Sequence, residues 1–223
     1  MTDRQPIGVV LAYPYAVVRA GLGLLIAGDR RLQLLAEVGS PEEALKALTT
    51  RRRGLRSVVV VGPGFEGTYD SYGLIRAIRE RFPAVKVVAT ASNADMDSIS
   101  RSLFYGADGF VDHIVHPSEF LTGLCKAAEG DTVLVGPPSE WLGPIADLVE
   151  QQNADRSLLT RREQEVLVAA SDGGTARQIA QNLGLRERTV TTHLGRIYGK
   201  LGVNSRMAAV STAARRGLVP LGH

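Results

Sequence analysis

Short apolar runs alternate with segments of helical spacing through the first 130 residues, and this alternation restricts the fold more than any other feature of the chain. The purest run is 58–61, four valines that end at a glycine and proline cluster. The runs of strand length are 7–12, 32–38, 58–61, 85–90 and 109–111. Strands that are apolar throughout are typical of a parallel sheet covered by helices on both faces. We therefore predict a doubly wound α/β domain with a five-stranded parallel sheet.

The remainder of the chain is predicted to be helical and to form a second domain. Thr160 followed three residues later by Glu163 is a capping box that begins a helix. Helices predicted over 176–183 and 187–201 are joined by a short turn at Gly184, which is the helix-turn-helix arrangement. Gly136, Pro137 and Pro138 interrupt the pattern between the halves. We expect an α/β domain over 1–132, a linker over 133–156 and a helical domain over 157–223.

The charge of the chain is divided unevenly between these halves. Of its Lys and Arg residues, 15 lie in 1–150 with 18 Asp and Glu, whereas 11 lie in 151–223 with only 5 acids. A basic segment beside a mildly acidic one indicates a nucleic-acid-binding module attached to a domain that need not touch nucleic acid. The alternative is a solvated charged face.

Composition removes several other classes of protein. The single cysteine, Cys125, excludes an internal disulfide framework and any multi-cysteine metal site. No apolar run has the length of a membrane span, and the first residues lack a secretory pattern. No Ser-His-Asp order or paired carboxylates indicate an enzyme, and no cofactor or metal is expected. We expect a cytoplasmic protein without membrane contact.

The helix predicted over 187–201 has two distinct sides. Apolar residues at spacing i, i+4, i+7, i+11 form a stripe for burial, namely Val190, Leu194, Ile197 and Leu201. The opposite side has arginines, threonines and glycines, which suit a major groove because Arg reaches phosphate or guanine and Thr contacts base edges. Gly195 and Gly199 are costly inside a helix. Close approach to DNA explains them, and tight helix packing explains Gly199 equally well.

The segments 159–167, 178–185, 189–194 and 200–203 resemble the four-helix DNA-binding domain of LuxR-type regulators. This resemblance implies a homodimer on double-stranded DNA, with Arg196, Lys200 and His193 near the phosphates and Thr191 near the bases. The full set of predicted DNA-binding residues is Arg186, Arg188, Thr189, Thr191, Thr192, His193, Gly195, Arg196 and Lys200. Arg186 departs from the family, which has a serine or threonine cap there.

The first 130 residues resemble a receiver domain, so the whole chain is similar to NarL/FixJ-type response regulators with a flavodoxin-like sheet. The resemblance implies a phosphoryl pocket made of two acids, an aspartate nucleophile, a hydroxyl and a lysine. The matching positions here hold Tyr13 and Pro14, Gly62, Thr90 and His113. Only the hydroxyl of Thr90 remains. We therefore expect an atypical pseudo-receiver that aspartyl phosphorylation does not control.

Three roles for the pseudo-receiver stay open. The first is a sensor whose altered pocket takes an uncharged or aromatic ligand. The second is a docking module for a protein partner or a second copy. The third is a nucleotide- or metabolite-binding, enzyme-like domain, because Gly62–Gly67 is spelled G-x-G-x-x-G after a strand. Pro63 within the turn and the missing acid after the next strand count against that third role. For the pocket itself, filling by Tyr13 and Tyr15 is as good an explanation as a ligand.

Overall fold

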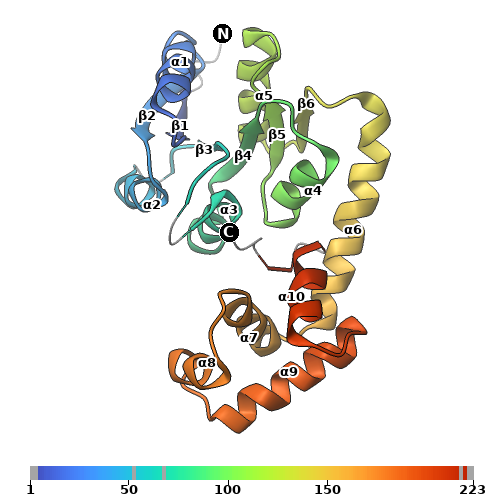
Figure 1. The fold of residues 1–223 in the computed structure, drawn as a ribbon. Helices are drawn as coiled ribbons and strands as arrows, with labels where there is room; N and C mark the ends of the chain where they lie inside the picture. Colours follow the sequence, from blue (N-terminus) through green and yellow to red (C-terminus); the bar gives the residue numbers. More distant parts are fainter. Residues whose placement is uncertain (1–4, 52–53, 67–68, 216–217, 220–223) are drawn as a thin grey trace. The chain divides into compact units, whose positions relative to one another are not determined.

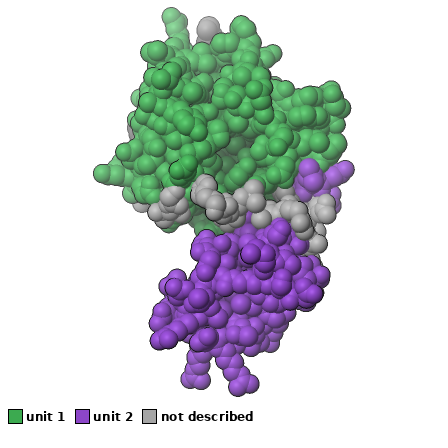
Figure 2. All heavy atoms as spheres, viewed as in Figure 1, with its two compact units in different colours: residues 1–146 green, residues 147–223 purple. Residues whose placement is uncertain are grey.

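The computed structural model describes residues 5–51, 54–66, 69–215 and 218–219, and it divides into two compact units, residues 1–146 and 147–223 (Figure 2). Unit 1 holds a parallel sheet with strand order β2-β1-β3-β4-β5-β6 (Figure 1). Its strands are β1 (Ile7–Ala12), β2 (Leu32–Val38), β3 (Ser57–Val61), β4 (Lys86–Ala91), β5 (Gly109–Asp112) and β6 (Val133–Val135). The predicted doubly wound α/β fold is confirmed.

The sheet has one strand more than predicted. β6 pairs in parallel with β5, from Gly109 opposite Val133 to Val111 opposite Val135. It lies inside the segment 133–156 that we expected to be a linker, and the long helix α6 (Leu142–Leu158) occupies much of the rest of that segment. The five-stranded sheet of the sequence analysis is therefore corrected to six strands, because this short edge strand carries too few residues for a strand pattern.

The helices of unit 1 begin where side chains can accept hydrogen bonds from the first turn. Ser40, Asp70 and Asp95 each accept a bond from the backbone N–H three residues later, which satisfies one orphan donor of each helix. The helices are α1 (Ala16–Ala27), α2 (Pro41–Thr50), α3 (Ser71–Arg81), α4 (Met96–Phe104) and α5 (Pro117–Glu129). The short 3-10 helix Ser139–Trp141 precedes α6.

The core of unit 1 lies between the sheet and its helices. Leu11 of β1 and Val60 of β3 are fully buried together with Ile26 of α1 and Leu124 of α5. Both α1 and α5 therefore cover one face of the sheet, and α2, α3 and α4 cover the other (Figure 1). All the strands are parallel and end at the same edge of the sheet, so the β1–α1, β3–α3 and β5–α5 connections meet there. This edge carries Tyr13, Gly62 and His113, three of the residues expected at the altered pocket.

Unit 2 is helical. Its helices are the end of α6, α7 (Arg161–Ser171), α8 (Ala176–Leu183), α9 (Glu187–Leu201) and α10 (Arg206–Arg215). Thr160 and Thr175 begin α7 and α8 with complete capping boxes, and Gly184 ends α8 in the left-handed region at φ 63°. The predicted capping box at Thr160 and Glu163 is confirmed. Within the described residues, no helix has both the length and the apolar character to cross a membrane.

Candidate functional site

Helix α9 is anchored by its apolar side. Val190, Leu194, Ile197 and Leu201 are all buried, and they face α7, α8 and α10 of the same unit. This is the stripe predicted from the spacing. Anchoring one side of a helix leaves the other side for contact with a partner.

The outward side of α9 carries most of the residues that the sequence indicated for DNA. Arg188, Thr191, Thr192, Gly195 and Arg196 are exposed. The guanidinium groups of Arg188 and Arg196 have no hydrogen-bond or ion-pair partner among the described residues. Thr189 and His193 are half-buried beside the anchored stripe, so they lie at the edge of this surface. We call the five exposed residues the α9 face.

The two threonines on the α9 face use their hydroxyl protons within the helix. Thr191 Oγ1 donates to the carbonyl of Glu187 at 3.1 Å, and Thr192 Oγ1 donates to the carbonyl of Arg188 at 2.9 Å. Each hydroxyl oxygen keeps lone pairs that can accept, and each side chain keeps a methyl group. In a major groove these groups suit the amino groups of adenine or cytosine and the methyl group of thymine.

The two glycines of α9 are not explained by helix packing. A Cβ atom built at Gly195 or at Gly199 would meet no described atom within 4 Å. The packing explanation for Gly199 is therefore wrong within the described structure. Both positions leave bare backbone toward solvent, where another molecule can approach the helix axis closely.

Arg186 occupies the N-cap of α9 without capping it. Its backbone is extended, with φ −86° and ψ 145°, and its side chain makes no hydrogen bond to the first turn. The expected loss of the family's hydroxyl cap is confirmed. The exposed guanidinium of Arg186 lies at the start of the α9 face, where it extends the row of cations.

Lys200 differs from the other cations of α9 because it has a partner inside unit 2. Its Nζ donates to Glu163 Oε2 at 2.7 Å, and the Glu163 side chain is only 4% exposed. The same carboxylate oxygen accepts from the Thr160 backbone N–H at 2.7 Å. Glu163 thus joins the start of α7 to the end of α9. The sequence indicated Glu163 as a capping residue, but its role in positioning α9 was missed.

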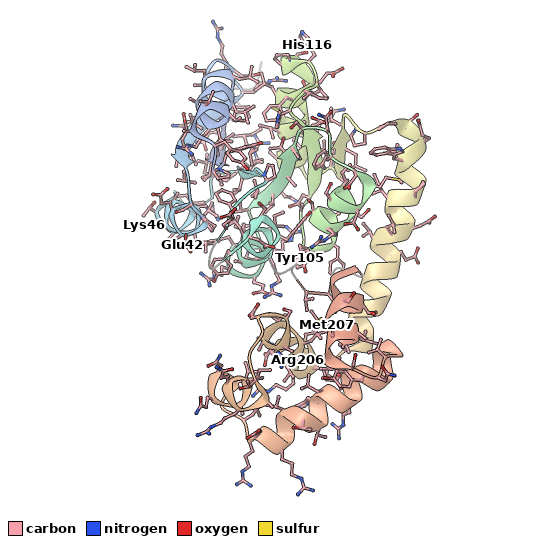
Figure 3. All side chains as sticks on the ribbon, viewed as in Figure 1. Glu42, Lys46, Tyr105, His116, Arg206 and Met207 are labelled. Carbon is pink, nitrogen blue, oxygen red and sulfur yellow. The ribbon has the colours of Figure 1, made fainter. Side chains whose placement is uncertain are left out.

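Two further arginines also hold unit 2 together. Arg162 donates from Nη2 to the carbonyl of Leu183 at the end of α8, at 2.7 Å. Arg206, at the start of α10 (Figure 3), donates from Nη2 to the carbonyl of Ala170 at 2.7 Å. Part of the positive charge of this half is therefore structural, whereas Arg188 and Arg196 of α9 have no such partner in the described structure.

The Glu163 carboxylate gives unit 2 a specific dependence on pH. Burial alone would raise the pKa of Glu163, but hydrogen bonds from Lys200 and Thr160 outweigh it and lower the pKa below the usual 4.5. Because the pKa of Glu163 is lower in the folded chain than in the unfolded chain, its ionised form stabilises the fold at pH values above the unfolded-state pKa. This stability is lost as pH falls through the folded-state pKa. At pH 7 we expect Glu163→Gln to lower the free energy of unfolding of unit 2 by about 1–2 kcal/mol.

Chemical denaturation of the full chain at several pH values checks this prediction. The difference in unfolding free energy between wild type and Glu163→Gln should be largest at pH 7. It should narrow as pH falls below about 4.5, where the unfolded chain binds the proton first, and be smallest once pH is below the lower folded-state pKa and the folded carboxyl is protonated as well. Lys200→Met is the matched variant, since it removes the other partner and should show the same narrowing. A difference that stays constant with pH would contradict the ion pair.

In unit 1, Tyr13 fills the space beside Gly62. A Cβ atom at Gly62 would collide with the ring carbons Cδ2, Cε2 and Cγ of Tyr13, whose side chain is 2% exposed. The ring lies 6.0 Å from the Tyr15 ring and 6.1 Å from His113, centroid to centroid. Arg19 fixes the connection that carries it by donating to the Tyr13 carbonyl at 2.6 Å. The space beside Gly62, where the family resemblance implies an aspartate side chain, is thus occupied by an aromatic ring.

The groups around this ring are uncharged at neutral pH or already bonded. Burial, with Tyr15 and Asp112 nearby, raises the pKa of Tyr13 to about 12. Burial lowers the pKa of His113 despite the adjacent Asp112, so the imidazole is neutral where a receiver has its lysine. The Thr90 hydroxyl donates to the Val111 carbonyl at 2.5 Å. The His113 ring is therefore not a cation at neutral pH, and the Thr90 hydroxyl proton is already donated.

Two of the nearby acids accept hydrogen bonds from the backbone. Asp70 accepts from the Gly73 backbone N–H at 2.6 Å as the cap of α3, and Asp112 accepts from Ile114 N–H at 3.0 Å. Pro14 offers no ligand atom on its side chain. Among the described residues, no group of three or more His, Cys, Asp or Glu is arranged to hold a metal ion.

The loop that starts at Gly62 lacks the geometry of a dinucleotide site. Such loops use glycine so that the backbone can approach a pyrophosphate. Here the space beside Gly62 is filled by Tyr13, and a Cβ at Gly64 would lie 2.5 Å from the Tyr15 hydroxyl oxygen. Phe65 is buried in the same loop. Gly67, the last residue of the motif, lies outside the described residues.

Comparisons with known proteins agree with both halves. Residues 157–213 match the family described as bacterial regulatory proteins, luxR family. The chain is 30% identical over 211 residues to the probable transcriptional regulatory protein SgaR of Hyphomicrobium methylovorum, covering 95% of this chain and 93% of SgaR. It is 25% identical over 216 residues to the nitrate/nitrite response regulator protein NarL of Escherichia coli K12, covering 94% and 95% of the two chains.

The fold is also found among solved structures. RcsB from Salmonella enterica serovar Typhimurium, bound to the promoter rprA in the presence of the phosphomimetic BeF3⁻, aligns with a TM-score of 0.55 at 18% identity. The alignment covers 93% of this chain and 98% of that one. The chain belongs to the response regulators that join a receiver domain to a LuxR-type helix-turn-helix domain. This is a family of DNA-binding transcriptional regulators, not of enzymes.

Proposed function

We propose that the chain is a sequence-specific transcriptional regulator of the cytoplasm that binds double-stranded DNA as a homodimer through α9. The observation that carries this proposal is the α9 face, with two arginines that lack a partner in the described part of the chain, two threonines and an open glycine on one side of an anchored helix. Arginines there neutralise phosphates, and the threonines meet base edges. We assign DNA binding to residues 157–223, the receiver-like fold to 1–132 and the connection to 133–156.

We further propose that aspartyl phosphorylation does not control this regulator. The support is the exchange of a nucleophile for Gly62 together with the Tyr13 ring that fills the vacated space. A ligand in this pocket would have to displace that buried ring. We therefore favour control of the pseudo-receiver through protein contacts over a small-molecule ligand at this position.

One experiment on the full chain tests both proposals. The protein is used to select duplexes from a randomised pool, with and without prior incubation with acetyl phosphate and Mg²⁺. We expect enriched sequences with two symmetric half-sites about one helical turn apart, as for dimeric helix-turn-helix proteins. We also expect no phosphoryl mass on the intact chain and equal DNA affinity in both samples.

The outcomes separate the two proposals. A stable aspartyl phosphate that raises DNA affinity would overturn the second proposal. Failure to enrich any sequence would overturn the first. A receiver that keeps its aspartate serves as the control that the phosphodonor is active.

A further inference from the structure

A pocket of 340 Å³ lies at the end of the sheet where the strands begin, away from the edge that carries Tyr13 and Gly62. A Cβ at Gly8 would lie 2.6 Å from Leu35 Cδ1 and 2.9 Å from Leu55 Cδ2, so these two half-buried side chains lie together over the start of β1. We call it the β2 pocket, and its lining residues are Gln5, Pro6, Gln33, Leu35 and Leu55. The lining thus combines apolar side chains with two amides.

The β2 pocket lies beside an unpaired strand edge. In the strand order β2 has only β1 as a neighbour among the described strands (Figure 1). It has seven residues, no proline and a single charged residue, Glu37. The strand at the opposite edge, β6, has three residues and is followed by Gly136, Pro137 and Pro138. Native sheets protect their edges with short strands, prolines and charges, so β2 is the edge that can accept another strand.

The pairing of β2 with β1 is regular beside the pocket. Ile7, Gly8 and Val9 lie opposite three consecutive residues of β2, and the register shifts only after Val9. The first half of β2 therefore runs as an ordinary extended strand. An added strand needs such a stretch, because its hydrogen bonds repeat along the edge.

Arginines surround this end of β2. The backbone carbonyls of Arg31 and Arg56 accept hydrogen bonds at 2.9 Å from the first two residues of β1, and Arg56 Nη2 donates to a carbonyl of the pocket lining at 3.5 Å. Arg31 is bonded to Asp29. Arg30 and Arg56 are exposed and have no ion-pair partner among the described residues. The loop 51–56 contains four arginines and no acid, although 52–53 lie outside the described residues. This surface is therefore suited to an acidic partner.

We propose that the β2 pocket and the adjoining edge of β2 form a docking site for an extended acidic segment of a partner protein. The segment adds to the sheet as a strand beside β2 and places one apolar side chain against Leu35 and Leu55. Its carboxylates lie against Arg30 and Arg56. Main-chain hydrogen bonds supply affinity and the pocket supplies specificity, as in other cases of strand addition. The inference rests on the proposed control of the pseudo-receiver through protein contacts, and it names the surface for that control.

The observations favour a peptide over a nucleic acid on this surface. Phosphates would also be attracted by Arg30 and Arg56, but a phosphate backbone makes no use of an apolar pocket or of an unpaired strand edge. The exposed Glu37 on the same strand would also repel a continuous row of phosphates. A short acidic segment can end before that residue.

Selection from a displayed library of short random peptides on the full chain tests the docking site. We expect enriched peptides in which Asp or Glu flanks an apolar residue, and the most enriched peptide is then titrated by fluorescence anisotropy. Leu55→Asp should weaken its binding by about tenfold or more, because the new carboxylate enters an apolar contact and repels an acidic peptide. Arg56→Glu should weaken binding by about threefold or more at about 0.05 M salt, and by less at about 0.5 M.

Ile114→Asp and Arg76→Glu are the matched controls for these two variants. They place the same charges on exposed residues of unit 1 that do not line the β2 pocket. Their affinity for the peptide should stay within about twofold of wild type.

The strand geometry is tested on the peptide, with the wild-type chain unchanged. A strand beside β2 turns every second backbone N–H toward it. Methylating the nitrogens of one alternate set should therefore abolish binding, and methylating the other set should leave it nearly unchanged.

Four results would overturn the proposal. They are a selection that enriches no peptide, full affinity in Leu55→Asp, an equal effect of the two methylated sets, and an Arg56→Glu variant that loses affinity for duplex DNA but not for the peptide. The last result would assign these arginines to nucleic acid. Because the peptide titrations contain no DNA, a failure of DNA binding through the α9 face is detected separately.

Discussion

Gly62→Asp is expected to destabilise unit 1 by about 3 kcal/mol or more instead of restoring a phosphorylation site. The Cβ of the new residue collides with the Tyr13 ring, and that ring is buried between Tyr15 and His113. Overpacking a core costs about 1–3 kcal/mol, and an unpaired buried carboxylate adds to this. Thermal unfolding of the full chain should show the unit 1 transition lowered by about 6 °C or more.

Two further variants separate the collision from a general effect of aspartate. Gly143→Asp, at a position where a Cβ would meet no described atom within 4 Å, should change stability by no more than about 0.5 kcal/mol. Tyr13→Ala combined with Gly62→Asp should be less destabilised than the sum of the single variants, with a coupling of about 1 kcal/mol or more. If the Gly62→Asp variant unfolds at the same temperature as the wild type, the Tyr13 ring moves aside easily and the prediction is wrong.

The central part of the fold could be predicted because its signals are local. The four valines at 58–61 are buried on both faces of the sheet, so the strand is apolar throughout. Ser40 and Thr160 accept hydrogen bonds from their own first turns, so a few neighbouring residues indicate where α2 and α7 begin. β6 could not be predicted in this way. Of its three residues only Val133 is buried, and its pairing depends on where α5 returns the chain beside β5.

In the candidate site, too, features that follow from local sequence could be predicted and contacts between distant residues could not. The α9 face follows from helical spacing alone, since fixing the buried stripe fixes the opposite side. The contact between Lys200 and Glu163 joins residues 37 apart in the sequence, so no local pattern reveals it. The family resemblance implies acids at the positions of both Tyr13 and Gly62. It does not show that one replacement fills the space of the other, because this depends on the direction of a ring across two strands.

Arg196→Ala is expected to weaken binding to every duplex by about tenfold at about 0.1 M salt and to lower the slope of log affinity against log salt by about one. The reason is that the exposed guanidinium of Arg196 has no partner among the described residues of unit 2 and is free to neutralise a phosphate. Lys200→Ala is the informative control. The family resemblance places both cations at the phosphates, but Lys200 is bonded to Glu163. We expect its loss to lower the stability of unit 2 while leaving the salt slope nearly unchanged.

Thr191→Ala and Thr192→Ala should act on sequence preference instead of the salt slope. With their protons donated to backbone carbonyls, these hydroxyls can only accept, and the methyl groups are free to contact thymine. Each loss should change the ratio of affinities between the selected duplex and a single-base variant by about tenfold, since a specific base contact contributes about 1–3 kcal/mol of discrimination. Titrations against a panel of single-base variants measure this ratio. Unchanged binding to every duplex in the triple variant of Thr191, Thr192 and Arg196 would show that another surface of unit 2 reads the DNA.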